Sequence, residues 1–351
     1  MRTVRSFRPH LNPIVVREVR TRMRGVRPYA ILTIFLVLLM LAGLGIYALM
    51  LQQSRFGGTL LSAQVGQALF KGLAYSEMLL VVVLAPVMTS GAISSEREHL
   101  TYDMLLATPL RPAQILWGKL FAALSYLFLL IFAAIPVFSV VMVFGGVELS
   151  ALPKALFLLL ATTVAFGAIG LFCSSLLRRT SRATTISYML VLFILGASMV
   201  LVGVWGRFST PPGMQPPPWT SYLNPFSGLL AITTLVPSGD PSMPFFGYAD
   251  PFSSLPLDAM LSPAVIYYGQ NGPVVIPVYR ATLLCYGLLT LILCWLSTHL
   301  VLPFRRWRPR WSDLGFLLML VGLLALAYIT RGWWNIAAPG QMPFFEPIPQ
   351  R

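Results

Sequence analysis

Long apolar runs constrain this sequence more than any other feature, because a soluble protein has no room to bury so many of them. Seven such runs cover roughly residues 30–51, 73–92, 117–144, 152–177, 184–205, 278–302 and 314–330. An α-helix rises 1.5 Å per residue, so ~20 apolar residues cross the ~30 Å hydrocarbon core of a bilayer. The sequence therefore predicts an all-α membrane protein with about seven transmembrane helices.

The composition excludes the alternative classes. Charged residues make up 10% of the chain and hydrophobic residues 57%, whereas a soluble domain carries roughly 25% charged residues. Disordered chains and coiled coils need a polar majority and are excluded for the same reason. The three cysteines (Cys173, Cys285 and Cys294) all lie in apolar runs, which argues against a disulfide framework and a metal site.

The basic residues predict how the chain is oriented in the membrane. The net charge is +14, and the cations fall between the apolar runs, which favours membrane topology over nucleic-acid binding. If the N-terminus is cytoplasmic, 18 of the 25 Lys and Arg residues lie on the inner side. Basic residues are enriched in cytoplasmic loops, so this orientation is expected. Seven spans then place the C-terminal tail outside.

The runs divide the chain into five parts. These are an N-terminal arm (1–29), five helices (30–205), a long exterior segment (206–277), two helices (278–330) and an exterior tail (331–351). The arm is too long for the polar start of a typical cleaved signal, so no cleavage is expected.

The N-terminal arm predicts an amphipathic helix lying on the membrane surface. Asn12 and Pro13 can open this helix and Gly25 can close it. Arg17, Arg20 and Arg24 share one face of it, where they would meet anionic headgroups. A solvated cluster of charges that only sets the topology is the alternative.

The exterior segment is rich in proline, with fourteen of the 28 prolines in the chain. Continuous helix is therefore not expected over most of it. A short helix is predicted near 225–236, because Asn224-Pro225 has the order of an N-cap followed by proline. This helix is too short to span the bilayer, so an interfacial or re-entrant helix is expected, with a buried element of an exterior cap as the alternative.

The segment between the second and third spans predicts a short charged helix over 94–108 on the cytoplasmic side. Ser95 and Glu98 have the spacing of a capping box, and Leu100, Met104 and Ala107 recur on one face. Pro109 ends the helix.

Three motifs in order resemble the ABC-2 type transporter permeases. They are Asn12-Pro13-Ile14 with Arg17-Glu18-x-Arg20, then Ser94-Ser95-Glu96-Arg97-Glu98 with Thr101, Leu105-Leu106 and Thr108-Pro109-Leu110, then Gly118-Lys119-Leu120. The match covers roughly residues 10–205, with weaker support from Asn224-Pro225-Phe226. It looks most like the bacterial branch grouped with multi-copper-enzyme maturation permeases. That family usually has six spans with both termini inside, so the seventh run and the tail 331–351 depart from its pattern.

The resemblance implies a role for the segment 94–108 as a coupling helix that docks on a cytosolic ABC ATPase subunit. The residues that would face or support this partner are Glu96, Arg97, Glu98, Thr101 and Leu105. It also implies a homo- or heterodimer of permease chains in the bacterial cytoplasmic membrane. ATP would be bound by the partner, because no Lys in this chain has the spacing of a phosphate-binding loop. No cofactor is expected in the chain itself.

Other functions are less well supported by the residues. No Ser/His, Asp/Asp or His/Glu set lies at predicted membrane depth, so the chain is not expected to be an enzyme. A proton- or sodium-coupled carrier is disfavoured because Glu77, Arg207, Arg280 and His299 are all placed near span ends. The resemblance implies that the chain is the permease subunit of an ABC-2 type exporter, which moves a substrate across the cytoplasmic membrane with ATP hydrolysed by a separate subunit. A non-transport membrane scaffold or assembly factor that binds a cytoplasmic partner is the alternative. The sequence does not specify a substrate.

Overall fold

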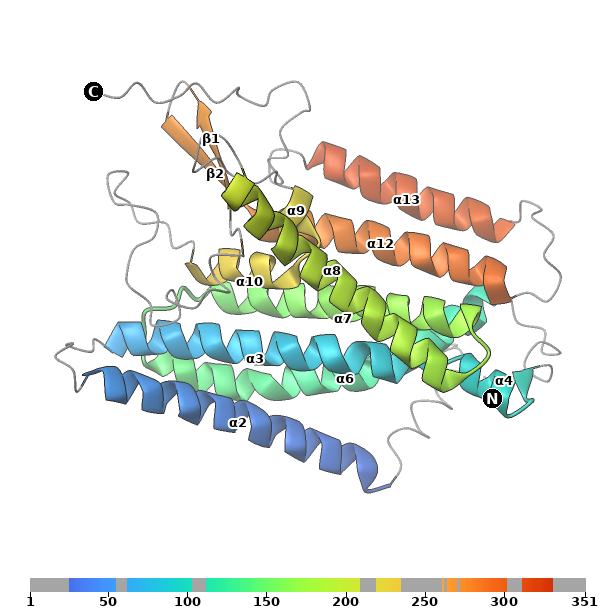
Figure 1. The fold of residues 1–351 in the computed structure, drawn as a ribbon, viewed down its shortest axis with the longest axis horizontal. Coiled ribbons are helices and arrows are strands. Elements are labelled where there is room, and N and C mark those ends of the chain that lie inside the picture. The colour runs from blue at the N-terminus through green and yellow to red at the C-terminus, as the bar shows by residue number, and fades with distance from the viewer. Residues whose placement is uncertain are drawn as a thin grey trace, which may run out of the picture.

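The computed structural model describes residues 25–54, 62–102, 112–208, 219–234, 261, 264–269, 272–301 and 311–330. Six described helices are long and apolar enough to cross a membrane. They are α2 (Arg27–Ser54), α3 (Ser62–Ser90), α6 (Pro112–Val143), α7 (Ala151–Leu176), α8 (Thr180–Phe208) and α12 (Val278–Val301). The prediction of a helical membrane protein is confirmed, and six of the seven expected runs form long helices (Figure 1).

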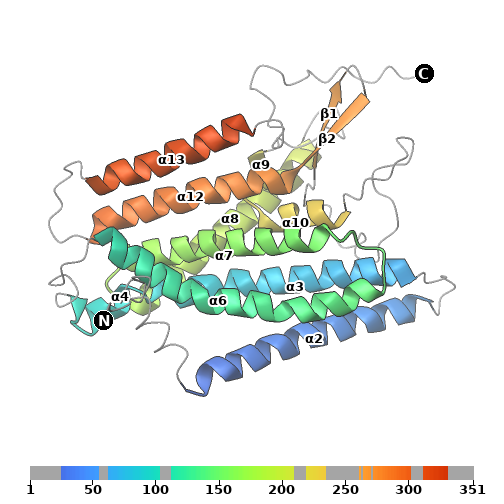
Figure 2. The same cartoon turned by 180° about the vertical axis from the view of Figure 1, so that it is seen from behind.

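The long helices form a bundle around α7, in which α3 and α12 run parallel to α7, and α2, α6 and α8 run the opposite way. Helix α7 packs against α3, α6, α8 and α12, and most of its residues are buried. Figure 2 shows the bundle from behind, with the short helix α4 (Ser94–Glu98) beyond one end of it. The ends of α3, α7 and α12 and the starts of α2, α6 and α8 lie at that end, which we call the α4 end.

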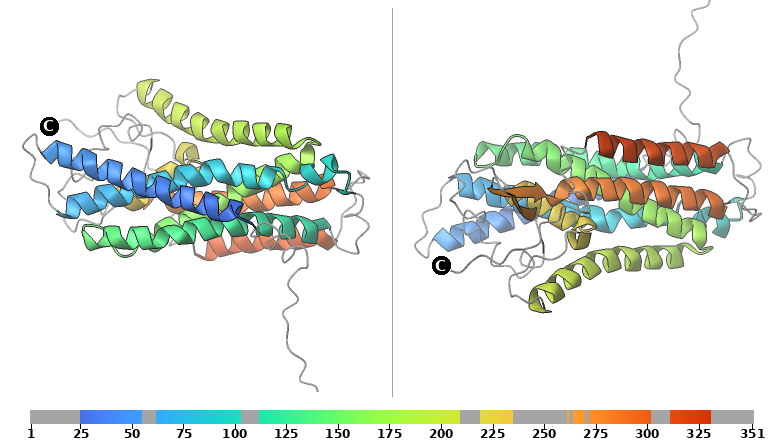
Figure 3. Two further views of the ribbon diagram at one scale, coloured as in Figure 1. Left: turned by 90° about the horizontal axis from the view of Figure 1, so that it is seen from below. Right: turned by 90° about the horizontal axis from the view of Figure 1, so that it is seen from above.

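The outer helices expose apolar surface. In Figure 3, α8 bends away from the bundle along its length, and Met189, Phe193 and Val200 on it are more than half exposed. On α2, Met40 and Leu44 are similarly exposed. Lipid tails are as apolar as these side chains, so a bilayer accommodates both faces.

The second span begins earlier than the sequence predicted. The apolar run starts at residue 73, whereas α3 begins at Ser62 and includes Gln67 and buried Lys71. The side chain of Gln67 donates to the carbonyl oxygen of Gly146 at 2.7 Å, so contacts within the protein hold this polar part of the helix. Glu77 therefore lies in the middle of α3. The sequence had placed Glu77 near the end of a span, and the depth of Glu77 in the membrane stays a prediction.

The seventh run forms α13 (Trp311–Ile329), which is shorter than the other six. It lies alongside α12. The ring of Phe316 stacks on Trp117 of α6, and His299 Nε2 of α12 is 3.2 Å from Asp313 Oδ1. Crossing of the membrane by α13 stays a prediction, and the tail 331–351 lies outside the described residues. So does the predicted arm helix with Arg17, Arg20 and Arg24.

The exterior segment contributes two short helices and a hairpin to the described structure. Helix α9 covers Trp219–Tyr222 and α10 covers Pro225–Thr234, while β1 (Ala264–Gly269) pairs antiparallel with β2 (Gly272–Pro277). The side-chain oxygen of Asn224 accepts a hydrogen bond from the N–H of Phe226 at 3.0 Å, the cap expected before Pro225. Leu229 and Ala231 are buried and α10 packs against α3, α7 and α12, so this helix is buried against the bundle, and its position relative to the bilayer stays a prediction. The hairpin was not expected from the proline-rich sequence of this segment.

Close contact between α3 and α7 gives a test of the packing. A Cβ atom added at Gly170 of α7 would lie 2.1 Å from Thr89 Oγ1 and 3.0 Å from the backbone oxygen of Pro86. Overpacking of this kind costs ~1–3 kcal/mol, so Gly170→Ala should lower the thermal unfolding temperature of the detergent-solubilised protein. Gly196→Ala on α8 is the matched control, since nothing lies within 4 Å of its added Cβ. Equal unfolding temperatures for the two variants would contradict this close contact.

Candidate functional site

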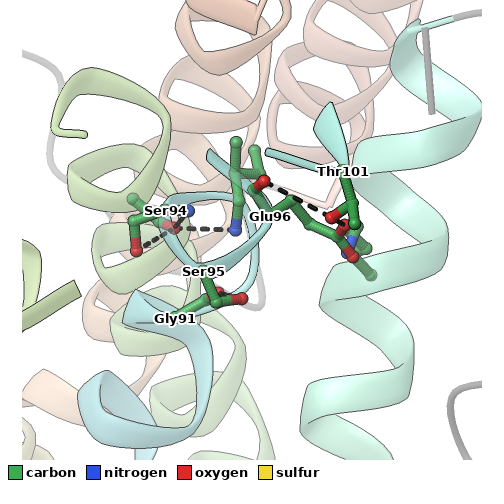
Figure 4. A network of polar contacts seen from close by, with 8 residues as sticks. Gly91, Ser94, Ser95, Glu96 and Thr101 are labelled. Atoms are coloured by element: carbon green, nitrogen blue, oxygen red, sulfur yellow. Dashed lines mark hydrogen bonds and ion pairs between the residues drawn. The ribbon is translucent and has the colours of Figure 1, made fainter. Parts of the chain in front are cut away.

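The candidate site is the short helix α4 together with the turn that follows it. The chain leaves α3 at Ser90, turns through 91–93 and forms α4 over Ser94–Glu98 (Figure 4). The predicted capping box is wrong. Ile93 occupies the N-cap without a side-chain hydrogen bond, and Ser95 Oγ instead donates to the carbonyl oxygen of Gly91 at 2.5 Å.

Helix α4 ends at Glu98, so the helix predicted over 94–108 is interrupted, and residues 103–108 lie outside the described residues. The N–H of Thr101 donates to the carbonyl oxygen of Glu96 at 3.0 Å, and the N–H of Leu100 donates to that of Arg97 at 3.4 Å. These two bonds form the Schellman motif that ends many helices, in which the residue at C′ is left-handed. Leu100 occupies this position with φ 59°. Glycine is usual there because a side chain costs roughly 1–2 kcal/mol in that conformation.

The start of α4 is held by the central helix α7. The hydroxyl oxygen of Ser174 accepts hydrogen bonds from the N–H groups of Ile93 and Ser94, both at 2.9 Å. It also donates to Ser94 Oγ at 3.3 Å. All three residues are buried, and an unpaired N–H at a buried helix start would be costly. Ser174 therefore acts as the N-terminal cap of α4 from a distant part of the chain.

Glu96 joins α4 to α6. Its Oε1 atom lies 3.0 Å from Nζ of Lys119, whose side chain is only 4% exposed. Its other carboxylate oxygen accepts a hydrogen bond from the hydroxyl of Thr101. Because Lys119 is buried, Glu96 balances a charge that would otherwise be unpaired inside the protein. Thr101 in turn fixes the orientation of that carboxylate.

Glu98 joins α4 to α8. Its two carboxylate oxygens accept hydrogen bonds from the backbone N–H of Thr180 at 3.0 Å and from the Thr180 hydroxyl at 2.7 Å. Thr180 is the first residue of α8, where an N–H lacks a partner within the helix and a negative charge is favourable. The bonds from the Thr180 hydroxyl and N–H lower the pKa of Glu98 below its usual value. Glu98 is therefore ionised at neutral pH.

The remaining predicted residues lie beside this network. The Arg97 guanidinium lies over the ring of Tyr102, 4.9 Å from its centroid. The Tyr102 hydroxyl donates to the carbonyl oxygen of Val301 at the end of α12. Leu105 lies outside the described residues.

The exposed surface of the site is its tip, formed by residues 98–101. Leu100 is 84% exposed there, so it does not pack onto the membrane domain. Glu96, Glu98 and Thr101 were predicted to face or support a partner, and all three make bonds within the chain. Nothing in the local sequence pointed to Ser174 or Thr180, whereas Lys119 belongs to the motif Gly118-Lys119-Leu120.

The contacts of the site join α4 to the neighbouring long helices. Among the described residues, no group of three or more His, Cys, Asp or Glu side chains is placed to hold a metal ion. The side chains of Ser174, Glu96, Glu98 and Tyr102 each bond a helix end or a neighbouring helix. The arrangement therefore fixes a small exposed tip firmly to the ends of several long helices.

Comparison with protein families identifies the class of the chain. The model of the ABC-2 family transporter protein matches residues 13–331. The chain belongs to this family. It is the membrane component of an ABC-2 transporter and carries no catalytic domain. The match extends beyond the motifs in 10–205 and includes α12 and α13, but it supports no particular branch of the family. Comparison with curated proteins found no significant match.

The cap on α4 gives a test at the level of single amides. Ser174→Ala should speed hydrogen exchange at the amides of Ile93 and Ser94, because both N–H groups lose their acceptor, at a cost of ~1–3 kcal/mol each for a buried group. Ser175→Ala is the matched control, since the Ser175 hydroxyl donates to the carbonyl oxygen of Phe172 within α7. Unchanged exchange in Ser174→Ala would show that another group caps the helix.

Proposed function

We propose that the chain is the membrane-spanning permease subunit of an ABC-2 exporter in the bacterial cytoplasmic membrane. It moves an unidentified substrate, and a separate ABC ATPase subunit binds and hydrolyses the ATP. The observation that carries the proposal is the attachment of α4, which bears the exposed tip, to three long helices through Ser174 of α7, Lys119 of α6 and Thr180 of α8. The family match supports the same function.

The polar contacts of α4 suit the transmission of force. A helix resting on the membrane domain through apolar contacts alone could slide, whereas charge-assisted hydrogen bonds fix both distance and direction. Movement of α4 therefore displaces the ends of α6, α7 and α8 together. In this proposal Glu96 and Glu98 transmit the movement within the chain, and the tip makes the contact with the ATPase.

Leu100 is the central contact in this scheme. A leucine 84% exposed in a left-handed conformation gains nothing from the fold of the isolated chain. Burial of Leu100 in an apolar pocket on the ATPase would offset the free-energy costs of its exposure and of its strained backbone. Arg97 supports the tip by its contact with Tyr102, and Leu105 would extend the contact surface.

The exposed apolar faces of α2 and α8 offer surface for a second permease chain, identical or different, as well as for lipid. The motifs that resemble the maturation permeases of multi-copper enzymes favour that branch.

The proposed orientation places the α4 end in the cytoplasm. Arg97, Lys119, Arg178, Arg179 and Arg182 lie near this end, in accord with the enrichment of basic residues inside. In a variant with Cys285→Ala, a cysteine replacing exposed Leu149, between α6 and α7, should react with an impermeant maleimide in intact cells. A cysteine replacing exposed Ser181 should react only after permeabilisation. The opposite pattern would invert the topology.

A charge swap tests the function. Glu96→Lys should lower stimulation of the co-purified ATPase about tenfold, as expected for the loss of ~1.4 kcal/mol, because two cations then meet at a buried site. Glu96→Lys with Lys119→Glu should restore stimulation, since the pair is re-formed with its charges exchanged. Leu100→Asp should instead reduce co-purification of the ATPase.

The variants distinguish the coupling role of Glu96 from direct contact with the ATPase and from a membrane scaffold. Failure of the double variant to restore stimulation, with loss of co-purification, would mean that Glu96 touches the ATPase directly. An ATPase that binds the chain but has the same turnover in all variants would favour the membrane scaffold. Abundance and membrane insertion should be the same in every variant, and are measured alongside.

A further inference from the structure

Glu77 is an unpartnered carboxylate in the middle of the membrane domain. It lies between Ser62 and Ser90, the two ends of α3, and near the midpoint of the helix. Its side chain has no exposed surface. Neither carboxylate oxygen has a hydrogen-bond partner in the described part of the chain. The role proposed for α4 makes no use of this residue.

The surroundings of Glu77 on its own helix are apolar. Leu73, Ala74, Met78 and Val81 are its neighbours at one turn or less, and all four are buried and belong to the main hydrophobic core. Helix α3 is packed against α2, α6, α7, α8 and α10. Glu77 therefore lies where water is excluded and where the dielectric constant is low.

The cations of the neighbouring helices are paired elsewhere or lie at helix ends. Lys119 of α6 pairs with Glu96, and Lys154 of α7 pairs with Glu148. Arg182 lies in the first turn of α8, Arg27 is the first residue of α2, and Arg207 lies in the last turn of α8. On α3 itself, Lys71 is six residues from Glu77 and therefore ~9 Å further along the axis, and it has contacts of its own.

The other titratable groups on these helices also leave Glu77 without a partner. Tyr126 of α6 donates to the carbonyl oxygen of Pro28, and Tyr188 of α8 donates to that of Val83. The remaining ones in the described residues are Tyr75 on α3, Tyr29 and Tyr47 on α2, and Cys173 on α7. None of them forms a hydrogen bond with either carboxylate oxygen of Glu77.

An ionised carboxylate is not stable in such a place. Burial of an isolated charge is so unfavourable that the group takes up a proton instead. A metal cation would need several oxygen ligands around it, and among the described residues no group of three or more His, Cys, Asp or Glu side chains is placed to hold one. A proton needs neither extra ligands nor extra room.

We propose that Glu77 is a proton-binding site in the middle of the membrane domain, occupied by a proton in this conformation. The proton can leave only when α3 separates from its neighbours and water reaches the carboxyl group. Loss of the proton then leaves a negative charge that opposes re-closure of the helices. Opening of the membrane domain is thereby linked to proton release, whichever partner drives it.

The experiment uses the purified full-length chain in detergent and needs no ATPase, so its failure is distinct from failure of the exporter function. The infrared spectrum of the wild type at neutral pH should contain the C=O band of a protonated carboxyl group. This band should be absent from Glu77→Gln, which has nearly the same shape and cannot ionise. Glu98→Gln is the matched control and should keep the band, because Glu98 is exposed and accepts bonds from Thr180.

Chemical modification provides a second measurement on the wild type. Dicyclohexylcarbodiimide reacts with protonated carboxyl groups in apolar surroundings, and peptide mapping should find it on Glu77 but not on Glu98. Labelling of Glu77 that sodium ions prevent would overturn the proposal in favour of a metal cation. An infrared spectrum of the wild type identical to that of Glu77→Gln at neutral pH would overturn it outright.

Discussion

The lack of water inside a bilayer determines most of this structure, because each buried polar group must find its partner within the protein. Backbone groups do so in the helices. Buried hydroxyl groups do so by bonding back to their own helix, as Thr89 does to the carbonyl oxygen of Ala85 and Thr162 to that of Leu158. Polar side chains can therefore line the helix contacts without opening the bundle. Glu77 is the exception among the described acidic residues, and its isolation is what makes it informative.

The same constraint explains the strength of the α4 end. There the chain leaves the apolar core, and helix ends present N–H groups and carbonyl oxygens that need partners. Ser174 satisfies the start of α4, and Glu98 satisfies the start of α8. Each bond meets a local requirement of one helix while tying it to another. A firm junction thus results from the ordinary capping of helices.

The sequence was sufficient for the order of the long helices and for six of them, because hydrophobic length is a local property, while the seventh predicted run forms the shorter α13. It misplaced the start of α3 because contacts inside the protein, such as that of Gln67 with Gly146, support polar residues that hydropathy excludes. The segment Ser94–Glu98 was recognised from its residues, but its geometry was not. Ser174, Lys119 and Thr180 reach it from distant positions, and Leu100 adopts a conformation that favours glycine. No local pattern contains this information.

The left-handed leucine at position 100 has a consequence for engineering. Glycine there would relieve the backbone strain and remove an exposed apolar side chain, so the unbound chain would gain stability. Selection for thermal stability alone would therefore favour replacing Leu100. That replacement would remove the side chain proposed to contact the ATPase. Stability and coupling make opposite demands on this one residue. The natural sequence has the less stable choice.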